Sequence, residues 1–316
     1  MTRLQEVDSA LIESVCARVR ERLGEDEAPQ AEEFVRQYYR RVPPEDLAEL
    51  DPLDLYGAAL AHWTFARHRD PGGTKVRVYN PDFEQHGWQS AHTVVELITD
   101  DMPFLVDSAT MELTGQGAGI HLLIHPVMRV QRAANGELVT VLVPEAQEEE
   151  EGTLAESFIH VEIDRVSEAS ELERLRERLL DVLRQVSAAV EDWPAMRRRA
   201  TELIAELHEP PPSLDRDECE EAAALLAWME DRHFTFLGFG EYELVTHDGE
   251  DRLRRVPGSG LGILRERPNG DRPRDSTLTA RARALAPSRA TRIRSSSPRP
   301  TADRRSTGPP TSTTSG

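Results

Sequence analysis

The sequence predicts an α+β fold, in which a helical N-terminal unit precedes a sheet with helices on one face and the start of a second α/β unit. Three observations support this. Apolar residues recur at helical spacing through residues 1–70. From residue 75 the pattern changes to the alternating and β-branched runs that are typical of strands. After a proline-rich stretch, a helical pattern and strand patterns begin again.

These changes of pattern divide the chain into five expected segments. They are a helical unit at 1–70, an α+β domain at 74–208, a proline-rich linker at 209–216, an incomplete second α/β unit at 217–264 and a tail at 265–316. The run Pro210–Pro212 is the stiffest point between two periodic regions, so we expect the domain boundary there.

The first segment reads as several amphipathic helices. A helix over residues 4–23 is predicted from apolar residues three or four apart, namely Leu4, Val7, Leu11, Val15, Val19 and Leu23. Further helices are expected over 32–41, 47–50 and 53–67. Pro43 and Pro44 end the helix expected at 32–41, and the turn Asp70–Gly73 ends the helical segment.

The second segment alternates strands and helices. Strands are expected at 75–79, 92–98, 120–130, 138–143 and 158–163, and a helix over 104–113 separates the second strand from the third. Asn135-Gly136 is a hairpin turn. Two helices are expected to follow, over 172–190 and 193–208. The incomplete unit would contain a helix at 217–231 and strands at 234–245 and 253–256.

The composition excludes several classes of partner. The net charge of −19 argues against a nucleic-acid footprint for the chain as a whole. No apolar run is long enough to cross a bilayer, and the N-terminus has no apolar signal-peptide core, so we expect a cytoplasmic protein without a membrane partner. Cys16 and Cys219 are expected to be free thiols.

One stretch resembles a regulatory module. The element order from His92 to Val190 is similar to the βαββαβ, ferredoxin-like plan of ACT-type modules, and Thr99–Ser108 resembles their strand-to-helix turn. ACT modules that bind amino acids usually carry glycine just after the turn proline, where this chain has Phe104. That departure favours a packing or subunit-contact role over small-molecule binding.

Three further segments resemble the N-terminal region of large bacterial NAD-specific glutamate dehydrogenases. They are Asp54–Ala59 with Trp63, Val78–Pro81 with Gly87-Trp88, and His233–Gly238, and the resemblance covers roughly residues 30–264. It implies oxidative deamination of L-glutamate with NAD by the whole enzyme, whose catalytic domain would lie downstream. This chain would bind no NAD and would contribute regulation or contacts, either with itself or with the remaining domains.

The turn supplies the candidate effector-binding residues, which are Asp100, Asp101, Met102, Pro103 and Phe104. A helix N-terminus there could face the carboxylate of an amino acid. The alternative is that Asp100, Asp101 and Asp107 cap the helix and complement its dipole.

Catalytic, cofactor and metal motifs are not predicted. The glycine-rich run Gly258–Gly262 lacks a following helix with a ribose-binding acid, so we expect a loop or hairpin end. A Ser108–His92–Asp107 triad has no support in the spacing. A metal site at His121, His125 and His160 is conceivable, but ordinary surface or core imidazoles are the default interpretation.

The tail has a different composition. From residue 266 it has four acidic residues against eleven arginines and no aromatic residue, so we expect disorder. One interpretation is a basic nucleic-acid-binding tail. The other interpretation is a frameshift near Leu264–Thr277 that truncates the enzyme. With suitable third bases, the codons for Ser297–Gly316 read one base out of phase give an amino-acid sequence that resembles the dehydrogenase family.

The sequence therefore favours a regulatory or oligomerisation fragment of such a dehydrogenase, inactive by itself. The alternative is a free-standing ACT-type amino-acid sensor or protein-interaction module, which would bind amino acids in calorimetry. A small hydrolase or metalloenzyme is a further rival, and it predicts activity or bound metal in the purified chain.

Overall fold

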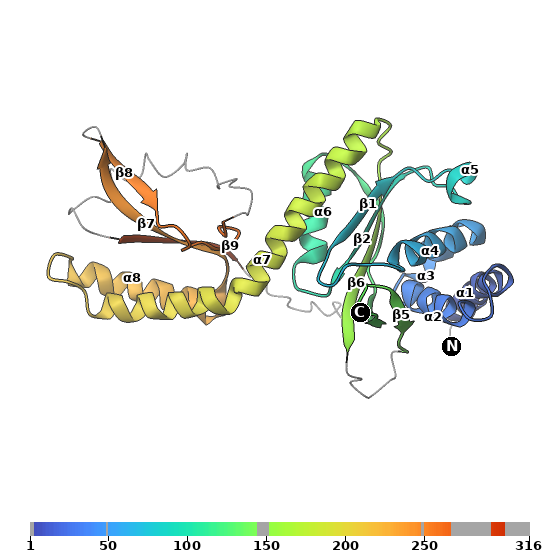
Figure 1. Ribbon diagram of the computed structural model, residues 1–316, viewed down its shortest axis with the longest axis horizontal. Helices are drawn as coiled ribbons and strands as arrows, with labels where there is room; N and C mark the ends of the chain where they lie inside the picture. The colour runs from blue at the N-terminus through green and yellow to red at the C-terminus, as the bar shows by residue number, and fades with distance from the viewer. Residues whose placement is uncertain (1–2, 49, 144–151, 248–249, 267–291, 301–316) are drawn as a thin grey trace, which may run out of the picture. The chain divides into compact units, whose positions relative to one another are not determined.

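The computed structural model describes residues 3–48, 50–143, 152–247, 250–266 and 292–300 (Figure 1). The chain forms two compact units, Met1–Val186 and Ser187–Gly316, and the division falls inside one long helix, α7 (Ala169–His208). The two units thus divide at Val186 and Ser187, before the predicted linker at 209–216. Two helices, over 172–190 and 193–208, were also expected where α7 is continuous, and the helix accommodates Pro194 in its interior.

Four helices open the first unit, close to the predicted spans: α1 (Arg3–Arg22), α2 (Ala28–Tyr39), α3 (Pro44–Ala48) and α4 (Pro52–Ala66). Local chemistry explains where α4 begins. The Asp51 carboxylate accepts a hydrogen bond from the Leu53 amide at 2.7 Å, and Pro52 occupies the first helical position. Across α1 and α2, the Glu13 carboxylate pairs with both Arg20 and Arg36.

A six-stranded antiparallel sheet follows. Its strands are β1 (Lys75–Tyr79), β2 (Thr93–Asp100), β3 (Ile120–Ile124), β4 (Val127–Arg132), β5 (Leu138–Val141) and β6 (Thr153–Ile163). The order is β1-β2-β6-β4-β5, and β3 also pairs with β6. The strand predicted at 120–130 is thus interrupted: β3 and β4 pair with successive stretches of β6, on either side of His125 and Pro126. Proline has no N–H to donate, so the ladder breaks there.

The topology follows the predicted plan in part. Helix α6 (Leu105–Gly115) connects β2 to β3, and both strands are antiparallel to β6, which lies between them. Helix α7 follows β6. In a βαββαβ plan a last strand would come after that helix. In the first unit, the edge beside β2 is instead occupied by β1, which precedes β2 in the chain. The short helix α5 (Phe83–His86) lies between β1 and β2 in sequence.

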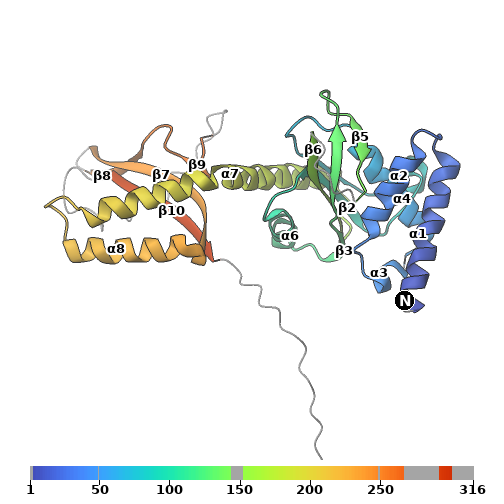
Figure 2. The same cartoon turned by 90° about the horizontal axis from the view of Figure 1, so that it is seen from below.

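Helices cover both faces of this sheet, not one. Figures 1 and 2 show α6 and the first half of α7 on one face and α1–α4 on the other. Ile98 and Phe158 share a core with α1, α2 and α4, and the rings of Phe34 and Phe158 lie 5.3 Å apart. The neighbouring strand residues Leu97 and Ile159 are also fully buried and point the opposite way. The predicted helical segment at 1–70 is therefore not an independent unit, because it shares its core with the sheet.

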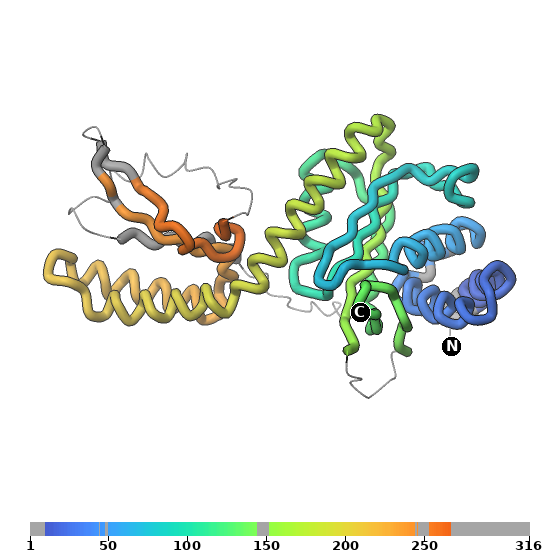
Figure 3. The backbone as a smooth tube through the Cα atoms, viewed as in Figure 1, coloured from blue at the N-terminus to red at the C-terminus, as the bar shows by residue number. Residues whose placement is uncertain are grey.

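The second unit combines a helical pair with a smaller sheet. Its elements after α7 are α8 (Arg216–Trp228), η1 (Met229–His233), β7 (Phe234–His247), β8 (Glu250–Arg255), β9 (Leu261–Gly262) and β10 (Arg292–Pro300). The prolines at 210–212 form the turn that brings α8 back along α7, as Figure 3 shows. Met196 and Ala200 of α7 pack against Phe236 and Phe239 of β7. The stretch predicted to be a linker is thus a helical hairpin turn inside a compact unit.

Part of the predicted disordered tail forms a strand. Residues Arg292–Pro300 make β10, antiparallel to β7, while residues 267–291 and 301–316 lie outside the described residues. Disorder was predicted because the tail cannot bury a core. Edge pairing does not need one, since an open strand offers backbone N–H and C=O groups to any extended segment. No helix among the described residues is both long and apolar enough to cross a membrane.

Candidate functional site

The five predicted effector residues lie together in the turn between β2 and α6. Pairing of β2 with β6 runs to the end of the strand, where Asp100 lies opposite Glu156. The Asp101 amide then donates to the Ala155 carbonyl at 2.8 Å, which extends the contact by one residue. Pro103 is exposed, Met102 is half-buried, and α6 begins at Leu105. The turn is therefore anchored to β6 through its acidic half.

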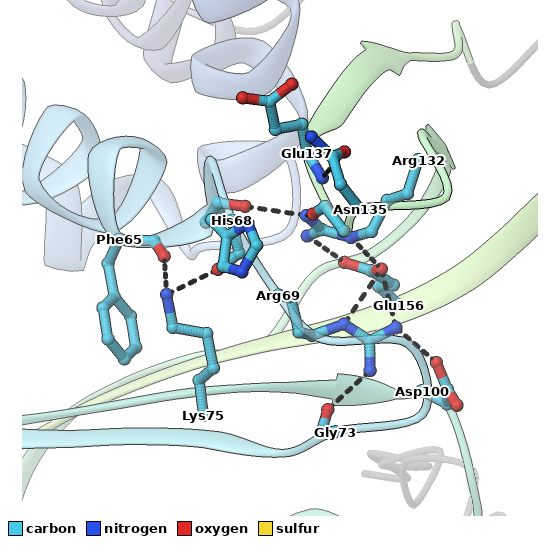
Figure 4. Close-up of polar contacts among 12 residues, drawn as sticks. Phe65, His68, Arg69, Gly73, Lys75, Asp100, Arg132, Asn135, Glu137 and Glu156 are labelled. Carbon is cyan, nitrogen blue, oxygen red and sulfur yellow. Dashed lines mark hydrogen bonds and ion pairs between the residues drawn. The ribbon is translucent and has the colours of Figure 1, made fainter.

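The Asp100 carboxylate is held by a buried arginine. The guanidinium of Arg69, which is fully buried, donates to Asp100, to the Gly73 carbonyl at 2.7 Å and to Glu156 at 2.8 Å (Figure 4). Arg132 donates to both oxygens of Glu156, at 2.6 and 2.8 Å. Two guanidinium groups thus face two carboxylates, which satisfies the rule that buried charges are paired. Asp100 belongs to this structural network.

The Asp101 carboxylate also has a protein partner. The Ser157 hydroxyl donates to it at 2.6 Å, and Nε2 of His125 lies 3.1 Å from the same hydroxyl. Burial lowers the pKa of His125, although the negative charge of Asp101 acts in the opposite direction. Both aspartates of the turn therefore bond to residues of the sheet or to the loop before it.

Phe104 has an unusual backbone. It lies just before α6 with φ of 72° and ψ of 2°, the left-handed region that favours glycine. It makes no side-chain capping bond, and its carbonyl accepts from the Ser108 amide at 2.9 Å. Its ring is 41% exposed. Met111, within α6, is 52% exposed. The turn thus presents an aromatic ring at the position where ligand-binding modules of this kind carry glycine.

The other histidines and hydroxyls named from the sequence do not converge. His92 bonds to Glu162 at 3.0 Å and stacks on His121 at 4.0 Å, so it forms no triad with Ser108 and Asp107. His121 pairs with Asp164 at 2.7 Å and His125 with Ser157, while His160 lies in the core. The glycine-rich run ends in β9, where the Gly262 amide donates to Asp192 at 2.8 Å, consistent with the predicted loop or hairpin end.

A cavity of about 590 Å³ lies beside the sheet on the face that α4 covers. Its walls include Trp88, Leu122, His160 and Glu162. The Glu162 carboxylate accepts from Ser90 at 2.8 Å and lies 3.0 Å from Nδ1 of His92. Burial tends to raise the pKa of Glu162, but its hydrogen bonds and the charge of His160 outweigh that effect and lower it to about 2. These partners therefore favour the ionised form of the Glu162 carboxylate on the cavity wall.

Sequence reasoning missed one polar group in the core. His62 of α4, Glu96 of β2 and His160 of β6 are all fully buried and lie together, and His160 also lines this cavity. A signal existed in the sequence, because each is a titratable residue inside an apolar run: Glu96 between Val95 and Leu97, for example. The sequence alone does not show that the three segments meet in the fold.

Comparison with known proteins gives consistent matches. Residues 34–179 match the model described as "Glutamate dehydrogenase, ACT1 domain". The chain is 42% identical over 256 residues to the NAD-specific glutamate dehydrogenase of Halomonas elongata, covering 81% of this chain and 16% of that protein. The corresponding protein of Pseudomonas aeruginosa is 37% identical over 77% of this chain and 15% of its own length.

A more distant relative shows the same pattern. The NAD-specific glutamate dehydrogenase of Mycobacterium tuberculosis is 29% identical over 71% of this chain and 13% of its own length. The chain thus spans about one-sixth, or less, of the length of the curated relatives that it matches.

Proposed function

The chain belongs to the family of large bacterial NAD-specific glutamate dehydrogenases, as part of their N-terminal region, and we propose that it serves there in regulation or subunit contact and not in catalysis. The whole enzyme would convert L-glutamate, NAD and water to 2-oxoglutarate, ammonium and NADH. This assignment of substrate and cofactor rests on the names of the relatives.

The left-handed backbone and the exposed side chain of Phe104 are the main support for a contact role. A residue other than glycine in the left-handed region costs roughly 1–2 kcal/mol, and such strain is a reason to look for function. The exposed residue stands just before the N-terminus of α6, the end that could otherwise face the carboxylate of an amino acid. The side chains of Phe104 and Met111 each offer exposed apolar surface to another subunit or to the remaining domains of the enzyme. We therefore favour packing over ligand binding at this turn.

The single lysine of the chain also argues against chemistry in this region. Nζ of Lys75 donates to the carbonyls of Phe65 and His68, each at 2.6 Å, and lies 4.2 Å from the centre of the Phe65 ring (Figure 4). These contacts fix the ammonium group within the fold. A lysine held by two carbonyl oxygens is poorly suited to act on a substrate carbonyl or amine.

Calorimetry on the purified chain tests the contact role against the sensor alternative. A panel of amino acids including L-glutamate should give no saturable heat with the wild-type chain. The Phe104→Gly variant, which restores the glycine of ligand-binding modules, shows whether the ring itself closes the turn. Saturable binding to the wild-type chain, weakened by Asp101→Asn, would favour an amino-acid sensor and contradict the proposal.

A further inference from the structure

We propose that His62, Glu96 and His160 form a binding site for a divalent transition metal ion, with zinc as the best match. Each residue offers one ligand atom, and these atoms lie within 4.8 Å of one another. All three side chains are fully buried. They come from α4, β2 and β6, so an ion would tie the helical layer to the middle of the sheet.

The first observation that points to a ligand is the set of imidazole nitrogens without partners. Nδ1 of His62 bonds to the hydroxyl of Tyr38 at 3.0 Å, and its Nε2 has no hydrogen-bond partner. Neither nitrogen of His160 has one. An unsatisfied buried polar group costs roughly 1–3 kcal/mol, so three such atoms in one place require an explanation. A cation would bind Nε2 of His62 and one nitrogen of His160, and the other His160 nitrogen would need a second partner.

The second observation is that the ligand set is complete and oriented. Two histidines and a glutamate are the protein ligands of well-known zinc sites. Oε2 of Glu96 is bound by Arg77, while Oε1 accepts from the Tyr79 hydroxyl at 3.1 Å and faces Nδ1 of His160 at 3.9 Å. Arg77 and Tyr79 therefore hold the carboxylate with Oε1 turned toward His160. This is how outer partners orient the ligands of a metal.

The other side of His160 fits the same scheme. Its Nε2 lies 3.6 Å from Oε1 of Glu162, which lines the cavity. A metal-bound histidine commonly directs its second nitrogen to a carboxylate, so Glu162 would be that partner. His160 itself also lines the cavity, which gives an ion a route to the site and water a route to a fourth ligand position.

The distances favour an ion over a closed hydrogen-bond network. The contacts of 3.9 and 3.6 Å from His160 to the two carboxylates are longer than N–H···O bonds. An ion about 2.1 Å from each ligand would hold tetrahedral ligands roughly 3.4 Å apart, so a modest inward movement of the three side chains would close the site. A protonated His160 between two carboxylates is the competing arrangement, and metal analysis distinguishes the two.

Zinc titration of the full chain tests the site. The protein is stripped with a chelator, dialysed, reconstituted with zinc chloride, and assayed for metal by mass spectrometry and for its melting temperature. We expect one zinc per chain and a higher melting temperature with zinc. His160→Gln and Glu96→Gln should lose stoichiometric binding. Tyr38→Phe, which removes only an outer partner and preserves the ring, should weaken zinc binding about 10–100-fold.

Two control variants separate this site from adventitious binding. His125→Gln changes a histidine of the same unit outside the cluster and should leave zinc affinity unchanged. His121→Gln removes one of the two stacked histidines at the surface, which could hold zinc by themselves, and should also leave it unchanged. The proposal is overturned if the wild-type chain takes up no stoichiometric zinc, if His160→Gln and Glu96→Gln retain it, or if either control variant loses it.

Discussion

Gly57 of α4 lies directly against Trp88, the aromatic residue that follows α5. A Cβ atom added to Gly57 would stand 2.1 Å from Cβ of Trp88 and 2.4 Å from its Cγ. Both residues belong to sequence segments by which the chain resembles the dehydrogenase family, and the fold brings these two segments into contact. Only glycine allows the indole to lie this close to the helix, where it is 1% exposed.

Gly57→Ala should therefore destabilise the protein although alanine is the better helix former. The gain in helix propensity is about 1 kcal/mol, while overpacking a core typically costs about 1–3 kcal/mol, so we expect a net loss of up to roughly 2 kcal/mol in urea unfolding. Gly115→Ala is the matched control, because nothing lies within 4 Å of a Cβ at the end of α6. Equal stability of the two variants would contradict the packing argument.

Glu156→Gln should be strongly destabilising. Glu156 is fully buried and is the shared partner of Arg69 and Arg132, and breaking a buried ion pair costs about 3–5 kcal/mol because it leaves charge uncompensated. Chemical denaturation of the variant measures the loss. Glu173→Gln, which removes an exposed partner of Arg176 on α7, should have no measurable effect. A small loss at Glu156 would show that solvent or Asp100 compensates the arginines.

The ionisation of Tyr39 should make the stability of the folded chain depend on pH in the alkaline range. Burial raises the pKa of its phenol well above the ordinary value, and the Glu162 carboxylate acts in the same direction. The hydroxyl donates to the Leu55 carbonyl at 2.7 Å. A group whose pKa is raised in the folded state stabilises it below the unfolded pKa, about 10 for tyrosine, and this contribution is lost as the pH rises above that value.

The wild-type chain should accordingly be more stable than Tyr39→Phe by about 1 kcal/mol at pH 8, and the difference should shrink by pH 10.5. Unfolding curves of both proteins at the two pH values provide the measurement. A difference that stays constant would mean that the phenol ionises equally in the folded and unfolded chains.

Phe104→Gly should stabilise the isolated chain by about 1 kcal/mol, because glycine removes the cost of the left-handed backbone. The same substitution should weaken any association that uses the exposed ring, which sedimentation velocity would detect as a lower average mass. Phe83→Ala, at a ring that is 59% exposed on α5, controls for loss of apolar surface alone. If Phe104→Gly destabilises the chain, the ring makes contacts within the fold that outweigh the strain.

The sequence carried enough information for most elements of the fold. Apolar spacing located α1 and α4, and alternation located β1 at Lys75–Tyr79 without error. It did not show that the helices share a core with the sheet, since the contact between Phe34 and Phe158 joins residues far apart in the chain. The continuity of α7 through Pro194 was missed because helix packing overrode a local breaker.

For the candidate sites, too, the sequence predicted features within one segment and missed contacts between distant segments. The turn Asp100–Phe104 could be found because it is one continuous segment, but the partners of its carboxylates, Arg69 and Ser157, come from other segments. The cluster of His62, Glu96 and His160 could not be found, since its members are 34 or more residues apart in sequence and meet only through the packing of α4 on the sheet. Strand β10 depends on backbone pairing, which composition does not encode.

Glutamate-dependent formation of NADH by the purified chain tests the central claim most directly. The proposed function predicts no absorbance change at 340 nm with saturating L-glutamate and NAD, under conditions in which an intact relative from this family turns over. Saturable NADH production by the chain alone would contradict the assignment of this region to regulation or subunit contact.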